Sequence, residues 1–355
     1  NMSKFKRIGV LTSGGDAPGM NAAVRAVTRL GIHKGIEVYG IYNGYQGLME
    51  GQVKRLGERD VSYIINRGGT MLYTARSEEF KTKEGIAKAV EQAKTLGLDG
   101  IVTIGGDGTF RGAVDLTDAG VPCIGIPGTI DNDIGSTEMT IGYDTAMNTI
   151  VQLVDKLRDT GESHARCNVV EVMGREAGDI ALNTAIAVGA VAAIITELPT
   201  DYETLFAKMI AARKNGKRNF IVILCEGMGK NYGEELCKTI EERTGIEARF
   251  ARPAHIQRGG SPTLRDRVLA TQMGCAAVES LVSGQMKKVV CLRDNSIITM
   301  DIHEALFLDK ILKNTITQDE IETIPPNTLY DLRRIVADRQ AYKSYLNYII
   351  NHMAL

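Results

Sequence analysis

The chain lacks an excess of charge of either sign. Lysine and arginine number 42, aspartate and glutamate 43, for a formal net charge of −1 over 355 residues. This balance excludes a protein that binds nucleic acid through a generally basic surface, and one built around a strongly acidic tail. Any anion that the protein binds must therefore be held by a local cluster of positive side chains.

Long apolar runs and paired cysteines are also missing. No stretch approaches the roughly 20 apolar residues that a membrane-spanning helix needs, and no signal-peptide pattern precedes the strand-like run at 8–11. The six cysteines are scattered, with no CxxC pair, which is typical of reduced thiols. We expect a cytoplasmic protein that engages neither membrane nor nucleic acid.

Glycine, in contrast, is abundant, at 38 of 355 residues, and it clusters directly after short apolar runs. Eight such runs have the length and composition of buried strands: 8–11, 38–42, 101–104, 123–126, 169–173, 192–196, 220–224 and 289–292. Helical patterns lie between them, among them 20–33, 83–96, 145–158 and 266–282. The alternation predicts an α/β protein with two doubly wound lobes and mostly parallel sheets. A (β/α)8 barrel ranks second, because the glycine clusters concentrate in the first 135 residues.

The loop at 12–21, TSGGDAPGMN, follows the first strand-like run and opens a helix. Glycines let backbone N–H groups approach a phosphate, and a helix N-terminus favours an anion. The loop is neither GxGxxG nor GxxxxGK[ST], so the two common nucleotide-binding fingerprints are absent. A tight turn that simply needs glycine is the alternative interpretation.

Two further loops follow successive strand-like runs and carry carboxylates. The first, 104–109, places Asp107 between glycines; a carboxylate beside a phosphate-binding loop suits Mg²⁺, although an Asx turn would also explain it. The second, 127–134, carries Asp131 and Asp133, of which one can act as a general base while the other shapes the metal environment. A polar loop with capping aspartates is its alternative.

Positive side chains lie in other loops after strands. Arginine matches phosphate with a planar, bidentate fork. These side chains supply the local anion cluster that the neutral net charge requires. They are Arg76, Arg166, Arg175, Arg249, His255 and Arg258.

Five motifs in order resemble the 6-phosphofructokinase family, in its bacterial form, over roughly residues 5–310. They are IGVLTSGGDAPGMN (8–21), GGDGT (105–109), PGTIDND (127–133), MGR (173–175) and HIQRGG (255–260). The resemblance implies phosphoryl transfer from ATP to fructose 6-phosphate with Mg²⁺, usually in a homotetramer. It also implies two lobes: 1–142 with about 257–307 for nucleotide and Mg²⁺, and 143–256 with about 308–355 for the sugar phosphate.

The resemblance assigns roles residue by residue. ATP would be held by Gly14, Arg76, Ser77, Gly106, Asp107, Gly108 and Thr109, with Asp107 on Mg²⁺. Asp131 would be the base that takes the proton of the sugar 1-hydroxyl, with Thr129 and Asp133 beside it. The sugar phosphate would be held by Met173, Gly174, Arg175, Glu226, His255 and Arg258, while Arg166 and Arg249 would reach in from a neighbouring subunit. Arg76, Arg175 and backbone N–H groups near Gly14 are candidates to stabilise the transferring phosphoryl group.

Glycines at 108 and 128 favour ATP as the donor. Pyrophosphate-using relatives typically carry Asp and Lys there. An Asp at 108 would crowd and repel the α-phosphate of ATP, and a Lys at 128 would fill the same space, whereas two glycines leave room at both positions. A pyrophosphate-dependent phosphofructokinase and a non-catalytic sugar-phosphate sensor remain the alternatives. One departure from the family is Ala254, where a glycine is usual before HIQRGG.

The resemblance weakens at the effector cleft and at the C-terminus. Effector anions would meet Arg25, Arg29, Arg158 and Lys217. However, Val191 stands where the family has an acidic metal ligand, and Asn215 where a basic residue is expected, so we expect blunted or absent ADP activation. After Pro325 and Pro326, apolar residues from 329 to 353 follow helical spacing. This predicts a helix packed on its own subunit or, alternatively, an added subunit contact.

Overall fold

A computed structural model describes residues 5–353. The first four residues, to which the expectation of no signal peptide also applies, lie outside the described range. The chain forms two compact units. Of the described residues, the first unit contains 5–129, 133–144 and 258–336, and the second contains 130–132, 145–257 and 337–353. Within the described range, no helix has the length and apolarity to cross a bilayer.

The first unit is built on a seven-stranded sheet in the order β11-β10-β5-β4-β1-β2-β3. Its central strands are parallel, while the edge strands β3 and β11 run antiparallel to their neighbours. Fully buried β4 and β5 explain why their sequences are continuous apolar runs. The strands are β1 Arg7–Thr12, β2 Glu37–Ile41, β3 Val53–Leu56, β4 Gly100–Gly105, β5 Cys123–Pro127, β10 Lys288–Arg293 and β11 Ser296–Asp301.

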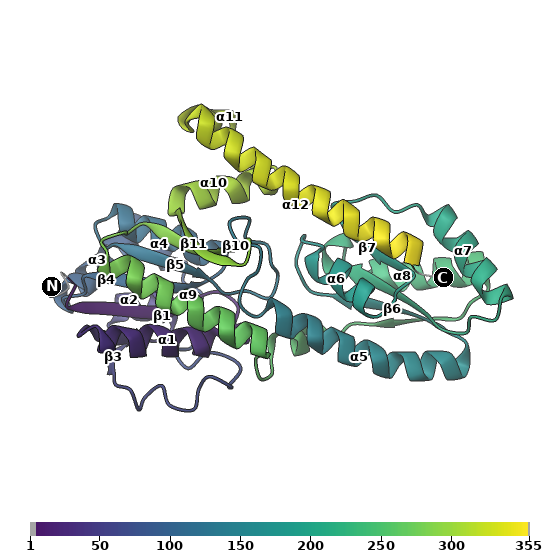
Figure 1. Ribbon diagram of the computed structural model, residues 1–355, viewed down its shortest axis with the longest axis horizontal. Helices are drawn as coiled ribbons and strands as arrows, with labels where there is room; N and C mark the ends of the chain where they lie inside the picture. The colour runs from purple at the N-terminus through teal and green to yellow at the C-terminus, as the bar shows by residue number, and fades with distance from the viewer. Residues whose placement is uncertain (1–4, 354–355) are drawn as a thin grey trace. The chain divides into compact units, whose positions relative to one another are not determined.

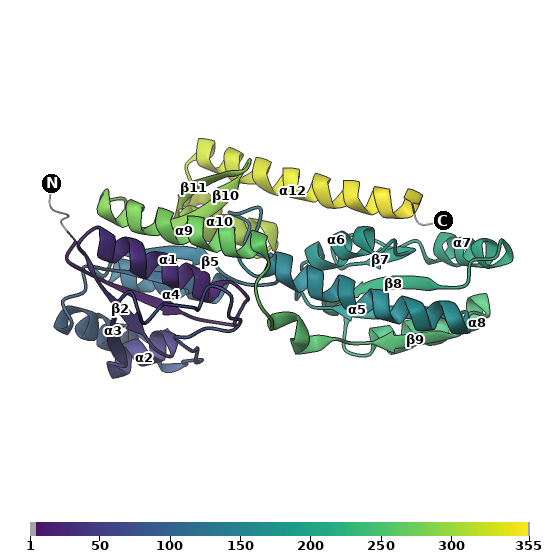
Figure 2. The same cartoon turned by 60° about the horizontal axis from the view of Figure 1, so that its bottom comes forward.

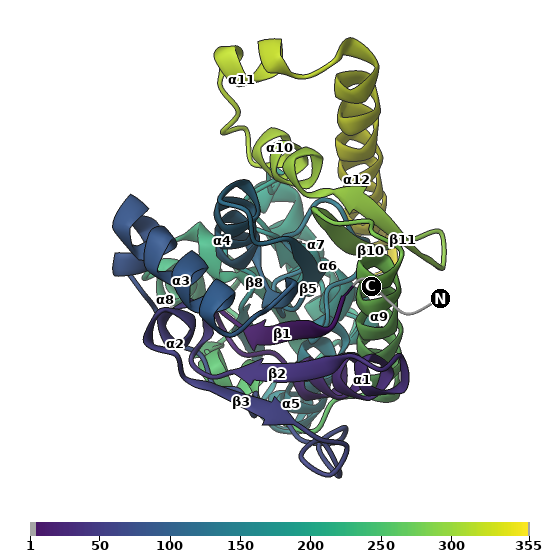
Figure 3. The ribbon, with the colours of Figure 1, turned by 90° about the vertical axis from the view of Figure 1, so that its left-hand side faces the viewer.

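Helices cover both faces of this sheet. Figure 3 shows α1 and α9 on one side and α3 and α4 on the other. Gly274 of α9 lies so close to α1 that an added Cβ would be 2.7 Å from that of Ala26, which explains a glycine inside a long helix. The helices are α1 Met20–His33, α2 Gly44–Glu50, η1 Glu79–Lys81, α3 Lys83–Thr95, α4 Asp107–Asp118, α9 Leu264–Val282, α10 Ile302–Leu312 and α11 Gln318–Thr323.

The second unit has a four-stranded, all-parallel sheet in the order β7-β8-β6-β9, drawn with its helices in Figure 2. Its strands are β6 Cys167–Val172, β7 Ala192–Ile194, β8 Phe220–Cys225 and β9 Ala248–Ala251. One face packs against α7 and α8 in a single apolar cluster. The remaining elements are α5 Tyr143–His164, α6 Asp179–Ala187, α7 Tyr202–Lys214, η2 Glu226–Met228, α8 Tyr232–Thr244 and η3 Ala254–Arg258.

The chain ends in a long helix, α12, Pro326–Met353, seen at the C-terminal end of the colour scale in Figure 1. Proline at its first position fits a helix start, because the missing N–H has no partner there in any case. Residues 337–353 belong to the second unit, where Lys208 Nζ also donates to the carbonyl of Asn351 at 2.8 Å. The helix predicted after Pro325 and Pro326 is thus confirmed and packs on its own chain.

The α/β class with two mostly parallel sheets is confirmed, and the barrel alternative is wrong. All eight predicted strands form. The units differ from the expected lobes in two places. Residues 308–336 join the first unit, because Leu308, Ile324, Leu332 and Val336 share an apolar cluster. Residues 130–132 join the second unit, although both flanks of that loop belong to the first.

All six cysteines are free thiols. Five are buried, and burial raises the pKa of Cys123 and of Cys225 to about 12 and that of Cys237 and of Cys291 to about 11. The expected reduced thiols are therefore compatible with the fold.

Candidate functional site

The glycine loops after β1 and β4 lie together in the first unit. β1 sits between β2 and β4, so the two loops leave the sheet where its strand order reverses, which is where open α/β sheets bind ligands. Ser13 N–H donates to the carbonyl of Ile104 at 3.0 Å, and Thr109 Oγ1 donates to the carbonyl of Ser13 at 3.1 Å. A Cβ on Gly105 would be 2.2 Å from Thr109 Oγ1, so only glycine permits this contact.

Gly14 and Gly108 have the properties expected of residues that bind phosphate. Gly14 adopts a left-handed backbone, with φ of 82°, and its carbonyl accepts from Thr74 Oγ1 at 2.8 Å. A Cβ on Gly108, in the first turn of α4, would meet no atom within 4 Å. Gly128 differs, because its Cβ would lie 3.1 Å from Ile104 Cγ2 and 3.3 Å from Met20 Cε. The room expected at both positions is present only at 108.

Asp107, the first residue of α4, is held as a carboxylate. Arg111 donates through Nε to Oδ1 at 3.3 Å and forms an ion pair with Oδ2. Burial works against ionisation, but the hydrogen bond from Arg111 and the charge of Lys313 outweigh it and keep the pKa of Asp107 below its ordinary value.

Lys313 lies between two of the predicted carboxylates. Its Nζ is 3.5 Å from Asp107 Oδ2 and 3.7 Å from Asp133 Oδ2. Asp309, one turn earlier at the end of α10, accepts from Gly135 N–H at 2.5 Å and so holds the loop beyond Asp133. Burial raises the pKa of Asp309 to about 7, against the lowering effect of Lys313 and Gly135, and Asp107 and Asp133 add to the rise.

These donors fit a magnesium ion bound together with a nucleotide. An ammonium group already stands near both carboxylates, so the place is favourable for a cation. Among the described residues, no three His, Cys, Asp or Glu side chains are arranged to hold a metal alone. Mg²⁺ suits such a site, because it typically takes one or two protein carboxylates and completes its shell with phosphates and water.

In the second unit, Asp131 is paired with Arg175. The carboxylate is almost completely buried, and Arg175 Nε lies 3.2 Å from Asp131 Oδ2. The Arg175 side chain is 64% exposed, so the same guanidinium can also reach a ligand. A buried carboxylate beside one exposed cation is a suitable place to accept a proton from a bound hydroxyl.

The loop that carries Arg175 is held by residues after two other strands. Glu226 Oε1, at the end of β8, accepts from the N–H groups of Gly174 at 3.1 Å and Arg175 at 2.7 Å. Gln257, fully buried in η3, accepts from Met173 N–H at 3.0 Å. Glu226 thus orders the loop through the backbone, which the sequence did not indicate.

Arg166 and Arg249 share one carboxylate. Arg166 Nε lies 2.8 Å from Glu247 Oε2, and Arg249 pairs with Glu247 Oε1.

The other candidate residues lie in both units. In the second unit His255 is exposed, as is Arg76 in the first. Arg258, of the first unit, lies directly over Gly15, where a Cβ would be 2.2 Å from its Nη1. Among the remaining candidates, Thr129 is buried, and Ser77 Oγ accepts from Phe80 N–H at 3.1 Å.

Of the residues expected at the effector cleft, those of the second unit contact other groups of the same unit. Arg158 Nη1 donates to Asn219 Oδ1 at 2.9 Å, and Nη2 donates to the carbonyl of Val188. Lys217 Nζ lies 5.7 Å from the centre of the Phe220 ring. Val191 belongs to the apolar core of this unit. Arg25 and Arg29 lie on α1 in the first unit.

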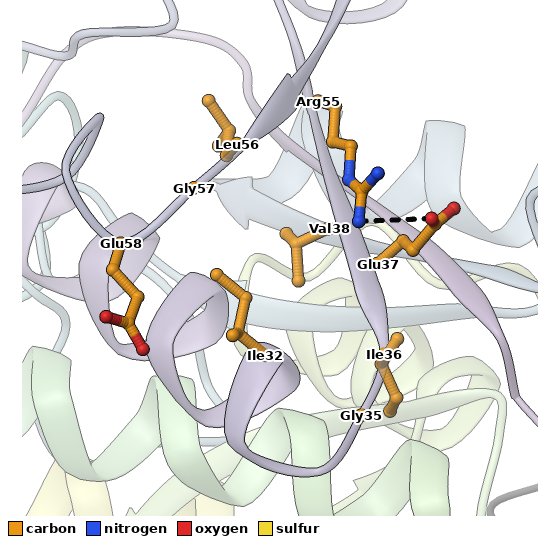
Figure 4. Close-up of a pocket in the computed structure, with 9 residues that line it drawn as sticks. All are labelled: Ile32, Gly35, Ile36, Glu37, Val38, Arg55, Leu56, Gly57 and Glu58. Atoms are coloured by element: carbon orange, nitrogen blue, oxygen red, sulfur yellow. Dashed lines mark ion pairs between the residues drawn. The ribbon is translucent and has the colours of Figure 1, made fainter.

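A surface pocket elsewhere in the first unit contains no predicted site residue. Its volume is about 520 Å³. Figure 4 shows the ion pair between Arg55 Nη2 and Glu37 Oε1, which lie 3.1 Å apart, and Glu37 also pairs with Arg7. The other lining side chains drawn there are mostly apolar, apart from Glu58. Nothing about this lining identifies a ligand.

Sequence reasoning missed the charged residues that hold the site, all of them outside the glycine motifs. Asp179, at the start of α6, pairs with Lys343 at 2.5 Å and Arg339 at 3.5 Å. Lys343 also pairs with Glu197 at 2.7 Å; burial alone would lower the pKa of Lys343, but these two carboxylates raise it above its ordinary value. The sequence did contain one signal for these contacts: Arg339 and Lys343 stand at helical spacing among positions of α12 that are otherwise apolar.

Comparison with known proteins agrees with this geometry. The family model described as Phosphofructokinase matches residues 7–281. The chain belongs to the phosphofructokinase family. It is 52% identical to the ATP-dependent 6-phosphofructokinase of Bacillus pumilus over 315 residues, covering 89% of this chain and 97% of that one. With the protein of the same description from Clostridium tetani it shares 53% over 305 residues, 86% and 95% of the two chains.

Among solved structures, phosphofructokinase from Saccharomyces cerevisiae is similar in fold, with a TM-score of 0.86 and 33% identity. The match covers 97% of this chain but only 50% of the yeast chain, so this phosphofructokinase chain spans about half the length of its yeast relative.

Proposed function

We propose that this phosphofructokinase transfers the terminal phosphoryl group of ATP to the 1-hydroxyl of fructose 6-phosphate, giving fructose 1,6-bisphosphate. The observation that carries the proposal is the buried Asp131 carboxylate, which lies beside the exposed Arg175 side chain. Asp131 is on the same loop as Asp133. Relatives more than half identical are described as ATP-dependent 6-phosphofructokinases.

Asp131 acts as the general base. It accepts the proton of the 1-hydroxyl as that oxygen attacks, and Arg175 stabilises the carboxylate beforehand and the charge on the transferring group afterwards. Phosphoryl transfer needs alignment and charge stabilisation more than covalent chemistry. Arg76 and the backbone N–H groups near Gly14 serve that purpose on the nucleotide side.

Asp107, with Asp133 beside the same Lys313, would hold Mg²⁺ together with the phosphates of ATP, and Gly14, Ser77, Gly106, Gly108 and Thr109 would line the nucleotide position. When bound, the ion neutralises phosphate charge during transfer. Arg111 keeps Asp107 ionised, so that carboxylate is ready to bind a cation. The sugar phosphate is bound by Met173, Gly174, Arg175, Glu226, His255 and Arg258.

Arg166 and Arg249 complete the sugar-phosphate site of a neighbouring subunit in a homo-oligomer, most simply a tetramer. Within one chain both arginines form ion pairs with Glu247, so a phosphate of the neighbouring subunit's substrate replaces that carboxylate as their partner. Activity should then fall on dilution. A fully active monomer, identified by light scattering, would contradict the assembly.

ATP is the donor rather than pyrophosphate. The open space beside Gly108 supports this choice, since an Asp side chain there would repel the α-phosphate. The decisive experiment measures fructose 1,6-bisphosphate formation with ATP and with pyrophosphate side by side. Product is expected with ATP and not with pyrophosphate. Product with pyrophosphate and not with ATP would refute the assignment of ATP as the donor. No product with either would favour a sugar-phosphate sensor.

A further inference from the structure

The peptide that follows Asp131 has an unfavourable conformation. Asn132 is left-handed, with φ of 52°, and only 3% exposed. Asparagine tolerates this region better than most residues, but non-glycine residues occupy it only where their surroundings hold them there. Because Asn132 follows Asp131 directly, its backbone angles help to set where the Asp131 carboxylate lies.

Two groups hold Asn132 from other elements of the second unit. Its side-chain Nδ2 donates to Asp179 Oδ1 at 3.2 Å. Its carbonyl accepts from Arg339 Nη2, on α12, at 2.8 Å. Arg339 also lies 3.5 Å from Asp179 Oδ1, so one guanidinium contacts both the carbonyl of Asn132 and the acceptor of its side chain.

The face of α12 that supplies Arg339 is otherwise apolar. Its inward stripe repeats every three or four residues: Leu332, Val336, Arg339, Lys343, Leu346 and Ile350. An apolar residue at 339 or 343 would continue the pattern; a buried ion pair replaced as a whole by apolar groups is often neutral or stabilising, whereas removal of one partner is costly. The apolar packing of the helix therefore does not by itself account for two cations, both of which face Asp179.

The second cation, Lys343, holds Asp179 in turn. Its Nζ lies 2.5 Å from Asp179 Oδ2 and 2.7 Å from Glu197 Oε1. Glu197 Oε1 also accepts from Gly178 N–H at 2.8 Å, in the segment between Arg175 and α6. Figure 1 and Figure 2 both draw the C-terminal half of α12 beside α6 and β7, the elements that these contacts join.

We propose that Arg339 of the C-terminal helix is a positioning residue for Asp131, which it orients by holding Asn132 in its left-handed conformation. Lys343 assists by fixing Asp179. This inference rests on the proposed role of Asp131 as the base. It gives the helix beyond residue 325 a catalytic purpose in addition to its packing.

The test compares Arg339→Met with Arg339→Lys and with Arg333→Met, an exposed arginine on the same helix. Arg339→Met should lower kcat by between about 10- and 100-fold, since misplacing a catalytic group by about 1 Å can cost that much. KM for fructose 6-phosphate should change by less than about threefold, because binding is not what Arg339 supports. Arg339→Lys should recover most of the lost kcat, and Arg333→Met should behave as wild type.

A double-mutant cycle separates positioning from general stability. If Arg339 acts through Asp131, adding Arg339→Met to Asp131→Asn should lower the residual kcat by less than about twofold. An equal loss in both backgrounds, or a loss that follows only the melting temperature, would overturn the positioning role, as would Arg339→Met with wild-type kcat.

Failure of the base assignment gives a different result. If Asp131 is not the base, the Asp131→Asn single variant would keep a kcat near that of wild type, independently of the kcat measured for Arg339→Met. A crystal structure of Arg339→Met that shows Asn132 still left-handed and Asp131 unmoved would also overturn the proposal.

Discussion

Both units place their candidate ligand-binding loops at the ends of parallel strands, but they hold those loops with different groups. In the first unit, glycine backbone makes the close contacts, as where Gly105 passes Ser13 and Thr109. In the second, side-chain acceptors and ion pairs hold the loops, as where Glu226 accepts from the Arg175 N–H and the Arg175 guanidinium pairs with Asp131. A glycine motif can be recognised from adjacent residues, even though its contacts reach as far as Ser13, whereas no local motif marks the partners of a charged network.

The largest effect should come from the carboxylate of the second unit. Asp131→Asn should lower kcat by about 10²–10⁴, the usual range for a lost general base. Binding of fructose 6-phosphate, measured by calorimetry, should change little. Asp133→Asn, two residues away but beside Lys313, should instead weaken divalent-metal binding. If Asp131→Asn kept more than half of the wild-type turnover, the two carboxylates would not divide their roles in this way.

A buried acid in the first unit should make stability depend on pH. The pKa of Asp309 is raised to about 7, so the folded protein binds this proton more tightly than the unfolded chain does. Stability should therefore fall as pH rises from about 4 to about 7 and stay low above it. Asp309→Asn keeps an acceptor for Gly135 and removes the charge.

Urea unfolding across this pH range measures the effect. The variant should gain about 2–4 kcal/mol over wild type by pH 8, since each pKa unit corresponds to about 1.4 kcal/mol. Parallel curves for the two proteins would show that Asp309 does not titrate there.

Two glycines of one loop test how far the first unit depends on backbone contacts. Gly105→Ala places a Cβ 2.2 Å from Thr109 Oγ1 and 2.4 Å from the carbonyl of Ser13, and should cost about 1–3 kcal/mol of stability. Gly108→Ala meets no atom within 4 Å inside α4 and should be neutral or stabilise by up to about 1 kcal/mol. Thermal melting of both variants measures the difference. Equal losses of stability in the two variants would refute the view that Gly105 is required by its close contacts with Ser13 and Thr109.

Lys313, like Arg111, is a charge on which the first unit relies in addition to its glycine loops. Lys313→Met removes the cation from Asp107 and Asp133 and should tighten Mn²⁺ binding without nucleotide by about two- to fivefold, as expected for a partly exposed ion pair. Lys310→Met, three residues earlier and paired with Glu320, is the control. Spin-resonance titration with Mn²⁺ gives the affinity, and unchanged binding would remove Lys313 from the metal site.

The smallest effect is expected at the effector cleft. Val191 is part of the apolar core, and Arg158 is bonded to Asn219 and Val188. MgADP should therefore shift the half-saturation for fructose 6-phosphate by much less than tenfold. Saturation curves with and without MgADP measure this, and a tenfold shift would show a working site despite Val191.

The strands, the glycine loops and the carboxylates at 107, 131 and 133 could all be predicted from the sequence, because each is encoded by neighbouring residues. Arg339 could not, because its importance depends on a contact 207 residues away, with the carbonyl of Asn132. The contact between Lys313 and Asp133 could not be predicted either, because the two residues meet only when α10 packs against α4 and the edge of the sheet. The tighter space at Gly128 could not be predicted, because the side chains that approach it, Met20 and Ile104, belong to other elements.

The buried cysteines have a practical consequence. Thiolate is the reactive form of cysteine, and at neutral pH a thiol whose pKa is about 11 or 12 is almost wholly protonated. We expect oxidants and alkylating reagents to leave the folded enzyme largely unmodified, apart from slow attack at the partly exposed Cys275. With Cys275 replaced by serine, one cysteine introduced on the exposed face of α12 would carry a fluorophore at a single position.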